Sequence, residues 1–200
     1  MASNLRPIRL PPADLAAIQL PRTRQVARSW YRVHPSVYTA IYFSLNPTHR
    51  YSHPNCSSKL LYIAIDPETS LWEYFGDKIY DNAHSLPKSH WDDASISTID
   101  VPPLPLCDLS TTSTRSAITV DLTALMNDDL DVPQQWGLAI QNHPSQVPAI
   151  KFKSRFTGKA CLAIFERGSA PGQLKEHLLD NLNQYNASLD WLSKHKVALI

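Results

Sequence analysis

The sequence predicts an α+β fold with several short strands and few helices. Residues 59–65 (KLLYIAI) form a continuous apolar run, which is typical of a strand buried on both faces. Directly after this run, Asp66 can accept hydrogen bonds from the free amides of a helix start, and Pro67 fits the first helical position. A chain of 200 residues that is 43% hydrophobic is long enough for one domain with a substantial core.

Further elements follow from the apolar runs and from the turn residues that bound them. The helix that begins at Pro67 is expected to reach Gly76, and a second helix is expected over residues 133–142. Residues 46–58 are expected to form a polar loop, and residues 77–91 to be irregular. Further strands are expected at residues 29–33, 39–45, 95–101, 116–122, 148–154 and 159–167.

Both ends of the chain differ from this central part. Residues 1–27 are rich in proline and arginine and are interpreted as an arm, with a short helix expected at residues 13–20. Residues 169–200 are expected to form one long amphipathic helix packed on the domain, because apolar side chains recur there at three- and four-residue steps. These side chains are Leu174, Leu178, Leu182, Tyr185, Leu189 and Leu192. The predicted organisation is an arm, a domain over residues 28–168 and a C-terminal helix.

Composition argues against several classes of function. A net charge of +1 gives no reason to expect a nucleic acid or an anionic membrane surface as partner. No run approaches the ~20 apolar residues of a membrane helix, and prolines interrupt the region where a signal peptide would lie. The five glycines leave no dinucleotide-binding, Walker or serine-hydrolase motif. The three cysteines are far apart in the sequence, which fits free thiols in a reducing compartment and predicts a cytoplasmic protein.

One carboxylate stands out near the predicted strand–helix junction. Glu73 lies between Trp72 and Tyr74, one to two turns after the expected helix start. On an ideal helix the neighbouring apolar side chains share one face and Glu73 points the other way, so solvent exposure is its simplest explanation. Its position close to the end of a buried strand fits a functional site as well.

Three other features of the sequence could belong to a binding or catalytic site, and each also has an ordinary structural explanation. Arg32 lies in an aromatic strand and needs a partner, which could be an acidic side chain or a bound anion. Ser154 lies at the end of a predicted strand, where serine usually makes a turn or a cap. The spacing H-x3-H-x2-C could contribute to a zinc site, but the fourth ligand would have to come from a distant segment, so surface histidines are favoured. The residues of this spacing are His49, His53 and Cys56.

The order and surroundings of these segments resemble the RES-domain family, which is named for an arginine, a glutamate and a serine. In the segment WYRV the family's arginine would be Arg32. In LLYIAIDPETSLWEYF its glutamate would be Glu73, and in AIKFKSRFTGKACLAIF its serine would be Ser154. The resemblance covers about residues 28–168.

Further positions extend the resemblance. In HRYSHP, Arg50 and Tyr51 match an arginine followed by an aromatic residue, and Tyr62 matches a tyrosine in the strand before the glutamate. Two positions depart from the family, because His49 and Ala149 stand where it often has glycine.

The resemblance implies a fold similar to that of ADP-ribosyltransferases, with NAD in a cleft of a split, strongly bent sheet. It implies the toxin component of a toxin–antitoxin pair, which consumes NAD as substrate by hydrolysis or phosphorolysis and inhibits growth unless its antitoxin is bound. The implied partner is an antitoxin with a helix-turn-helix part. The implied reaction needs no metal, and the oligomeric state is left open.

The resemblance also implies roles for individual residues. The catalytic residues would be Arg32, Glu73 and Ser154, and the NAD-binding residues would be Arg32, Arg50, Tyr51 and Tyr62. The carboxylate would stabilise the positive charge that develops on the ribose when the bond to nicotinamide breaks. The arginines would neutralise the diphosphate, the tyrosines would offer flat faces, and the serine would bind ribose or orient the glutamate.

Two other functions use the same residues or the same fold. A mono-ADP-ribosyltransferase that acts on a cellular protein would need the same catalytic set. A non-catalytic binding module could keep the fold without activity, although the three name-giving residues argue against it. A structural zinc protein is a more distant alternative.

Overall fold

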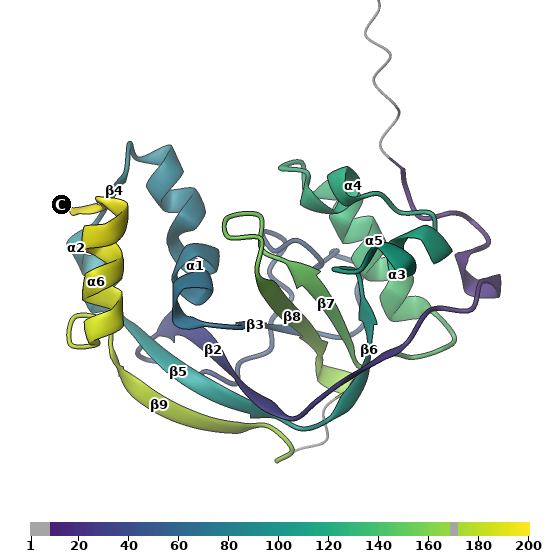
Figure 1. The fold of residues 1–200 in the computed structure, drawn as a ribbon, viewed down its shortest axis with the longest axis horizontal. Helices are drawn as coiled ribbons and strands as arrows, with labels where there is room; N and C mark the ends of the chain where they lie inside the picture. The colour runs from purple at the N-terminus through teal and green to yellow at the C-terminus, as the bar shows by residue number, and fades with distance from the viewer. Residues whose placement is uncertain (1–8, 169–171) are drawn as a thin grey trace, which may run out of the picture.

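The computed structural model describes residues 9–168 and 172–200, and its centre is a strongly curled sheet of eight strands (Figure 1). The strand order is β1-β6-β7-β8-β3-β2-β5-β9. The strands β6 and β7 are parallel, and the other neighbouring pairs of this sheet are antiparallel. Their bounds are β1 Thr23–Gln25, β2 Arg28–Pro35, β3 Leu60–Ala64, β5 Ala94–Val101, β6 Leu104–Asp108, β7 Ala149–Lys153, β8 Ala160–Phe165 and β9 Lys175–Asn181.

Helices form two groups, which stand on opposite sides of the hollow of the sheet in Figure 1. The first helical group comprises α1 (Pro67–Asp81), α2 (Lys88–Asp92) and α6 (Asn186–His195). The second helical group comprises α3 (Thr112–Ala117), α4 (Leu122–Met126) and α5 (Asp131–Asn142). The short strands β4 (Ser85–Leu86) and β10 (Ala198–Leu199) pair in parallel beside the first group, and 3-10 turns cover Leu15–Ala17 and Glu166–Gly168.

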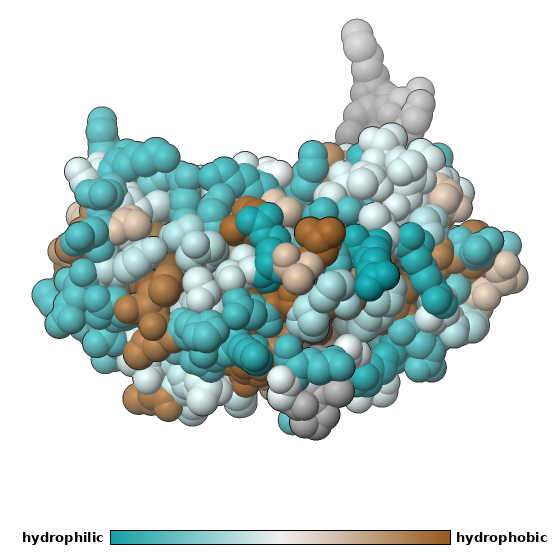
Figure 2. Space-filling model, turned by 60° about the horizontal axis from the view of Figure 1, so that its bottom comes forward, coloured by the Kyte–Doolittle hydropathy of each residue, from teal (hydrophilic) through white to brown (hydrophobic). Residues whose placement is uncertain are grey.

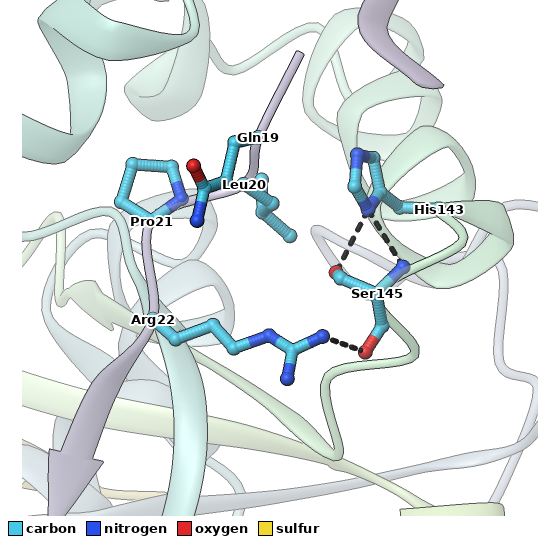
Figure 3. Close-up of a pocket in the computed structure, with 6 residues that line it drawn as sticks. All are labelled: Gln19, Leu20, Pro21, Arg22, His143 and Ser145. Carbon is cyan, nitrogen blue, oxygen red and sulfur yellow. Dashed lines mark hydrogen bonds between the residues drawn. The ribbon is translucent and has the colours of Figure 1, made fainter. Parts of the chain in front are cut away.

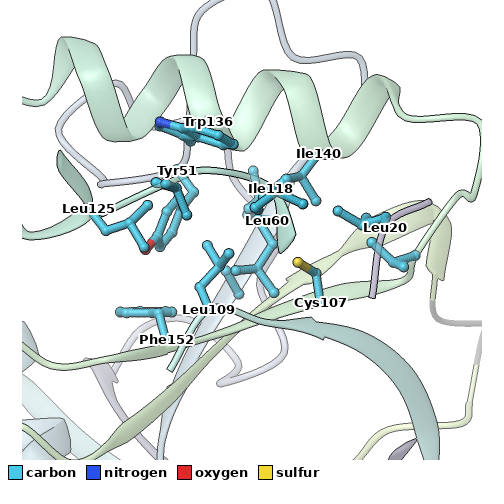
Figure 4. Close-up of a cluster of buried hydrophobic side chains, with 14 of the residues drawn as sticks. Leu20, Tyr51, Leu60, Cys107, Leu109, Ile118, Leu125, Trp136, Ile140 and Phe152 are labelled. Carbon is cyan, nitrogen blue, oxygen red and sulfur yellow. The ribbon is translucent and has the colours of Figure 1, made fainter. Parts of the chain in front are cut away.

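Alternation along the central strands divides the core into separate clusters. In β3, Leu60 and Ala64 belong to the cluster beneath the second helical group, whereas Leu61 and Ile63 belong to a cluster on the other face of the sheet. Beneath the first helical group, buried aromatic and aliphatic side chains from α1, α2 and α6 form the third cluster. Figure 4 shows the cluster beneath α5, where Trp136 lies over the side chains of the sheet.

Several predictions from the sequence are confirmed. The strands expected at residues 29–33, 59–65, 95–101, 148–154 and 159–167 correspond to β2, β3, β5, β7 and β8. The helix at 133–142 is α5, and the helix that begins at Pro67 is α1. Its cap is as expected, because the Thr69 amide donates to Asp66 Oδ1 over 2.8 Å.

The strand expected at residues 39–45 is wrong. In this segment only Ser44 makes a strand-like bridge, to Leu60. Side chains hold the rest of the segment, because Arg32 donates to the carbonyls of Ala40 and Tyr42, and Glu176 accepts from the Ala40 amide. Apart from this bridge, the segment is therefore irregular and lies outside the sheet.

The strand expected at residues 116–122 is also wrong. This stretch contains the end of α3, a turn and the start of α4, where the Ala124 amide donates to Asp121 Oδ1 over 2.6 Å. The region 77–91, expected to be irregular, contains the last turn of α1, β4 and the start of α2. The strand β6 was not predicted, because Pro102, Pro103 and Pro105 indicated the end of the strand before it.

The C-terminal helix expected over residues 169–200 is corrected. From Lys175 to Asn181 the chain forms β9, an edge strand paired with β5, and only Asn186–His195 forms a helix. Residues 169–171 lie outside the described part. At the other end, the arm is not separate from the sheet, because β1 pairs with β6. Within the described residues, no helix is both long enough and apolar enough to cross a membrane.

Candidate active site

A cavity of about 560 Å³ lies on the hollow side of the sheet between the two helical groups. This volume is within the range of small-molecule sites. Residues of β2, β3 and α1 line it, together with the segment after β2 and the turn between β7 and β8. Of the predicted site residues, the cavity brings together Arg32, Arg50, Tyr62 and Glu73.

The helix α1 presents Glu73 to this cavity. The buried face of α1, which includes Leu71, Phe75 and Ile79, packs into the core of the first helical group, so the opposite face turns toward the cavity. Glu73 is accessible to solvent there, although protein surrounds it on most sides. The prediction that Glu73 lies off the apolar face of the helix is confirmed. The face of α1 that carries Glu73 lines the cavity.

The carboxyl group of Glu73 is in an environment that acts in two directions on its pKa. Burial of the group raises the pKa above its usual value, because a charged carboxylate is poorly solvated there. A hydrogen bond from Ser154 and the positive charges of Arg50 and Arg155 act in the opposite direction. These groups favour the ionised form that a cationic centre on a ligand would need.

Ser154, which interacts with the carboxyl group of Glu73, is fully buried. Its Oγ accepts hydrogen bonds from the amides of Phe156 (3.2 Å) and Thr157 (3.3 Å), at the start of the turn between β7 and β8. Both acceptor positions of the hydroxyl are thus used, and its one proton is free to bond with the Glu73 carboxylate. Ser154 is therefore both a turn residue and a partner of Glu73.

Arg32 lies on β2 at the wall of the cavity. Its Nη1 donates to the carbonyl oxygens of Ala40 (2.5 Å) and Tyr42 (3.0 Å). Burial lowers the pKa of its guanidinium to about 10, and the charge of Glu176 opposes this change. Arg32 therefore stays protonated at neutral pH and contributes a fixed positive charge.

Arg50 supplies a second cation from the loop after β2. Its Nη1 donates to the carbonyl oxygens of Leu125 (2.7 Å) and Asn127 (2.9 Å), which ties the loop to the end of α4. Beside it, the ring of His49 lies 4.9 Å from the ring of Tyr62. Burial, together with the charge of Arg32, lowers the pKa of His49 to about 4, so His49 is neutral at pH 7.

A model of the RES domain matches residues 29–186 of this chain. The chain belongs to the RES-domain family. Among solved structures, a chain of the M. tuberculosis MbcT–MbcA toxin–antitoxin complex has a TM-score of 0.68 and 19% identity, over 91% of this chain and 98% of that chain. At this identity the likeness shows the fold alone. A comparison with curated proteins finds no match.

Family membership and the solved structure confirm the predicted fold class, an α+β fold with a split, bent sheet. The match to the family model extends to residue 186, whereas the resemblance noted in the sequence covered residues up to about 168. It includes β9 and reaches the first residue of α6.

Two of the predicted RES-domain residues, Tyr51 and Ser154, do not line the cavity, and Tyr51 faces the core instead. Its side chain is 1% exposed and packs in the core beneath α5, with its ring 5.1 Å from that of Phe152. Tyr62 lines the cavity, and its hydroxyl oxygen accepts a hydrogen bond from the Tyr51 amide over 3.1 Å. Tyr51 therefore supports Tyr62 through its backbone.

Arg155 is a residue of the site that the sequence reasoning did not select. It lines the cavity from the turn after Ser154 and forms ion pairs with Asp77 of α1 and Asp128, which precedes α5. Its guanidinium carbon lies 4.7 Å from the centre of the Phe156 ring. Its place next to Ser154 in the segment FKSRF was the available signal.

The zinc spacing in the sequence does not form a cluster. His53 Nδ1 accepts from the Asn55 amide over 3.0 Å, His49 packs on Tyr62, and Cys56 is buried. Among the described residues, no group of three or more histidine, cysteine or acidic side chains is arranged to hold a metal ion.

A second cavity, of about 630 Å³, lies where the N-terminal segment meets the end of α5 (Figure 3). There His143 Nε2 bonds with the Ile18 carbonyl (3.0 Å), its Nδ1 bonds with Ser145 Oγ (2.7 Å), and Arg22 donates to the Ser145 carbonyl (2.7 Å). Both nitrogens of the imidazole are used in holding the two segments together. This arrangement is structural.

Proposed function

We propose that this protein is a RES-type toxin that consumes NAD by cleaving the bond between nicotinamide and ribose. The observation that carries this proposal is the position of Glu73, a solvent-accessible carboxylate in a cavity, hydrogen-bonded to Ser154 and near two arginines. Membership of the RES-domain family and the fold of the toxin–antitoxin complex support it.

The chemistry follows from the charge that develops during cleavage. As the bond breaks, its electron pair leaves with the nicotinamide nitrogen, and the ribose carbon becomes an oxocarbenium-like centre. A fixed carboxylate beside that centre stabilises it, and a preorganised electrostatic group of this kind contributes about 3 kcal/mol. We assign this role to Glu73, with Ser154 holding the carboxylate in place.

The second half of the reaction needs a nucleophile. Water adds its oxygen to the ribose carbon and releases a proton, which gives ADP-ribose and free nicotinamide. Inorganic phosphate in place of water gives the phosphorylated sugar. We assign the neutralisation of the diphosphate to Arg32 and Arg50, because both are charged and line the same cavity. Tyr62 offers a flat wall for nicotinamide.

The partner and the compartment are part of the proposal. The solved structure that resembles this chain belongs to a toxin–antitoxin complex, which supports an antitoxin as partner. We propose that this antitoxin carries a helix-turn-helix part. The three buried free cysteines fit a reducing compartment, which supports the cytoplasm.

The test is release of nicotinamide from NAD by purified, antitoxin-free protein, with and without phosphate. We expect release by the wild type and loss of at least 100-fold in rate for Glu73→Gln. Asp81→Asn removes an exposed carboxylate from the same helix and is the matched control. Dependence on phosphate identifies phosphorolysis. Folded wild-type protein that releases no nicotinamide contradicts NAD hydrolysis and phosphorolysis, and a mass increase on a cellular protein would then indicate ADP-ribosyl transfer.

A further inference from the structure

Two exposed tyrosines line the same cavity as Glu73. Tyr38 is 59% exposed and Tyr42 is 53% exposed, although large aromatic side chains are usually covered. Their rings stack on each other, with centres 5.7 Å apart and planes inclined by 18°. We call Tyr38 and Tyr42 the tyrosine pair.

The protein holds the backbone beneath the tyrosine pair in one place. Arg32 donates to the carbonyls of Ala40 and Tyr42, and Glu176 accepts from the Ala40 amide over 2.8 Å. Ala40 itself is fully buried against the outer face of the sheet. Since the backbone is held at Ala40 and Tyr42 and the two rings stack on each other, a ligand would have less of this surface to order on binding.

The tyrosine pair and Glu73 line the same cavity and have different arginines as neighbours. Glu73 is near Arg50 and Arg155, whose charges act on its carboxyl group. The tyrosine pair is next to Arg32, which binds the Tyr42 carbonyl directly. A ligand that occupies this cavity can therefore meet a carboxylate, positive charge and a flat aromatic surface together.

We propose that the tyrosine pair stacks on the adenine base of a dinucleotide whose nicotinamide end lies at Glu73. This inference rests on the proposed function and deepens it by assigning the second half of the substrate. Purine bases present large flat faces, and stacking on aromatic side chains is a general way to bind them. The diphosphate between the two halves then lies beside the arginines.

The test is equilibrium binding of two ligands, ADP-ribose and ribose 5-phosphate, to the full chain. Tyr38→Ala and Tyr42→Ala are each expected to weaken ADP-ribose binding about 5- to 100-fold and to leave ribose 5-phosphate binding unchanged. Tyr42→Phe keeps the ring and is expected to bind like the wild type. Val37→Ala is the matched control, because Val37 is 82% exposed in the same segment and does not line the cavity.

Each outcome supports or overturns the inference separately from the proposed function. Unchanged ADP-ribose affinity in both alanine variants overturns the inference, and so does an equal loss for both ligands. If the wild type releases nicotinamide while the alanine variants keep its KM for NAD, only the inference fails. If folded wild-type protein neither binds ADP-ribose nor releases nicotinamide, the proposed function fails together with it.

Discussion

At the scale of single residues, Ser154 shows how one hydroxyl can serve both fold and site. Its oxygen accepts two backbone amides of the turn, and its proton is available to Glu73. The carboxylate therefore takes its position from a turn that the sheet itself fixes. A serine that follows β7 can therefore serve the turn and the carboxylate together, which a small residue without a hydroxyl cannot do.

Ser154→Ala is expected to lower kcat for NAD cleavage about 10- to 100-fold, because a hydrogen bond to a charged group contributes about 1.5–3 kcal/mol. Without its donor, Glu73 should also have a higher pKa, so the acid side of the pH profile of kcat/KM should move to higher pH. The measurement is that profile for wild type and variant. An unchanged profile would show that Ser154 does not act through Glu73.

The ionised carboxylate of Glu73 should lower the stability of the folded protein at the same pH at which it supports activity. Its folded-state pKa is raised by burial, so the folded protein binds the proton more tightly than the unfolded chain does. Stability is then lost as pH rises through the folded-state pKa, where the carboxylate ionises. Glu73→Gln is expected to have a higher Tm than the wild type at pH 7 and an equal Tm at pH 4. Thermal melts at both pH values check this, and a lower Tm for the variant at pH 7 would contradict it.

The residue scale also shows what the sequence could and could not predict about the site. The resemblance selected Arg32, Arg50, Tyr62 and Glu73, which share one cavity, because each is a chemically distinctive residue in a recognisable segment. It also selected Tyr51, which faces the core beneath α5. Adjacent residues in a loop can point in opposite directions, and no periodicity in the sequence fixes which one faces the ligand.

At the scale of elements, close packing of the β7–β8 turn on α1 shapes the site. A Cβ atom at Gly76 would lie 2.5 Å from the ring of Phe156, so only glycine lets this ring rest on the helix. Phe156 follows Arg155 in the turn and stacks on Trp72, with ring centres 5.8 Å apart. The turn that carries Ser154 and Arg155 is thereby located against the helix that carries Glu73.

Gly76→Ala is expected to destabilise the fold by about 1–3 kcal/mol, because the new methyl group displaces a packed ring. In an open helix position the same change stabilises by about 1 kcal/mol, so the sign is diagnostic. Denaturant unfolding measures the difference, and kcat should fall as the turn shifts. Adding Phe156→Leu should restore part of the stability. A more stable Gly76→Ala variant would disprove this packing.

A cluster of charges ties the start of α1 to two other elements. Glu68 accepts from Lys194 of α6 (2.7 Å) and from Lys159 of the turn before β8 (3.2 Å). These contacts lower the pKa of Glu68 to about 2, and the hydrogen bond from Lys194 has the largest effect. Since solvent screens the cluster, its contribution is expected to be small.

Glu68→Gln is expected to lower stability at pH 7 by about 0.5–1 kcal/mol. Because the folded-state pKa lies below the usual 4.5, this contribution is present above pH 4.5 and is lost as pH falls toward 2. Urea unfolding of both proteins at pH 7 and pH 2.5 measures it. A difference that is larger at pH 2.5 than at pH 7 would contradict the role of these contacts.

Two elements show why parts of the fold could not be predicted. Leu174 and Leu178 are four residues apart, and side chains at this spacing lie on the same face of a helix and also on the same face of a strand. The pattern therefore did not distinguish the two, and the structure has the strand β9 in this region. Residues 39–45 have strand-like composition, but Arg32 and Glu176 bind their backbone in place of a ladder. Arg32 lies outside the segment and Glu176 is distant from it in the sequence, so the local pattern of residues 39–45 does not record these contacts.

At the scale of the whole molecule, the curled sheet brings the two helical groups to either side of one cavity (Figure 1). Arg155 pairs with Asp77 of the first group and with Asp128 beside the second, so a cation of the site lies between the two groups. Figure 2 turns the bottom of the molecule in Figure 1 toward the viewer, and hydrophobic areas are interspersed among hydrophilic ones on this face.

The central claim is that Glu73 acts on the bond between nicotinamide and ribose. The most direct measurement follows NAD by proton NMR after addition of wild-type protein or Glu73→Gln, together with the affinity of each for NAD. We predict that the wild type converts the signal of the ribose proton next to nicotinamide into that of the product, whereas the variant binds NAD and leaves it intact. Cleavage by Glu73→Gln at the wild-type rate would contradict the claim.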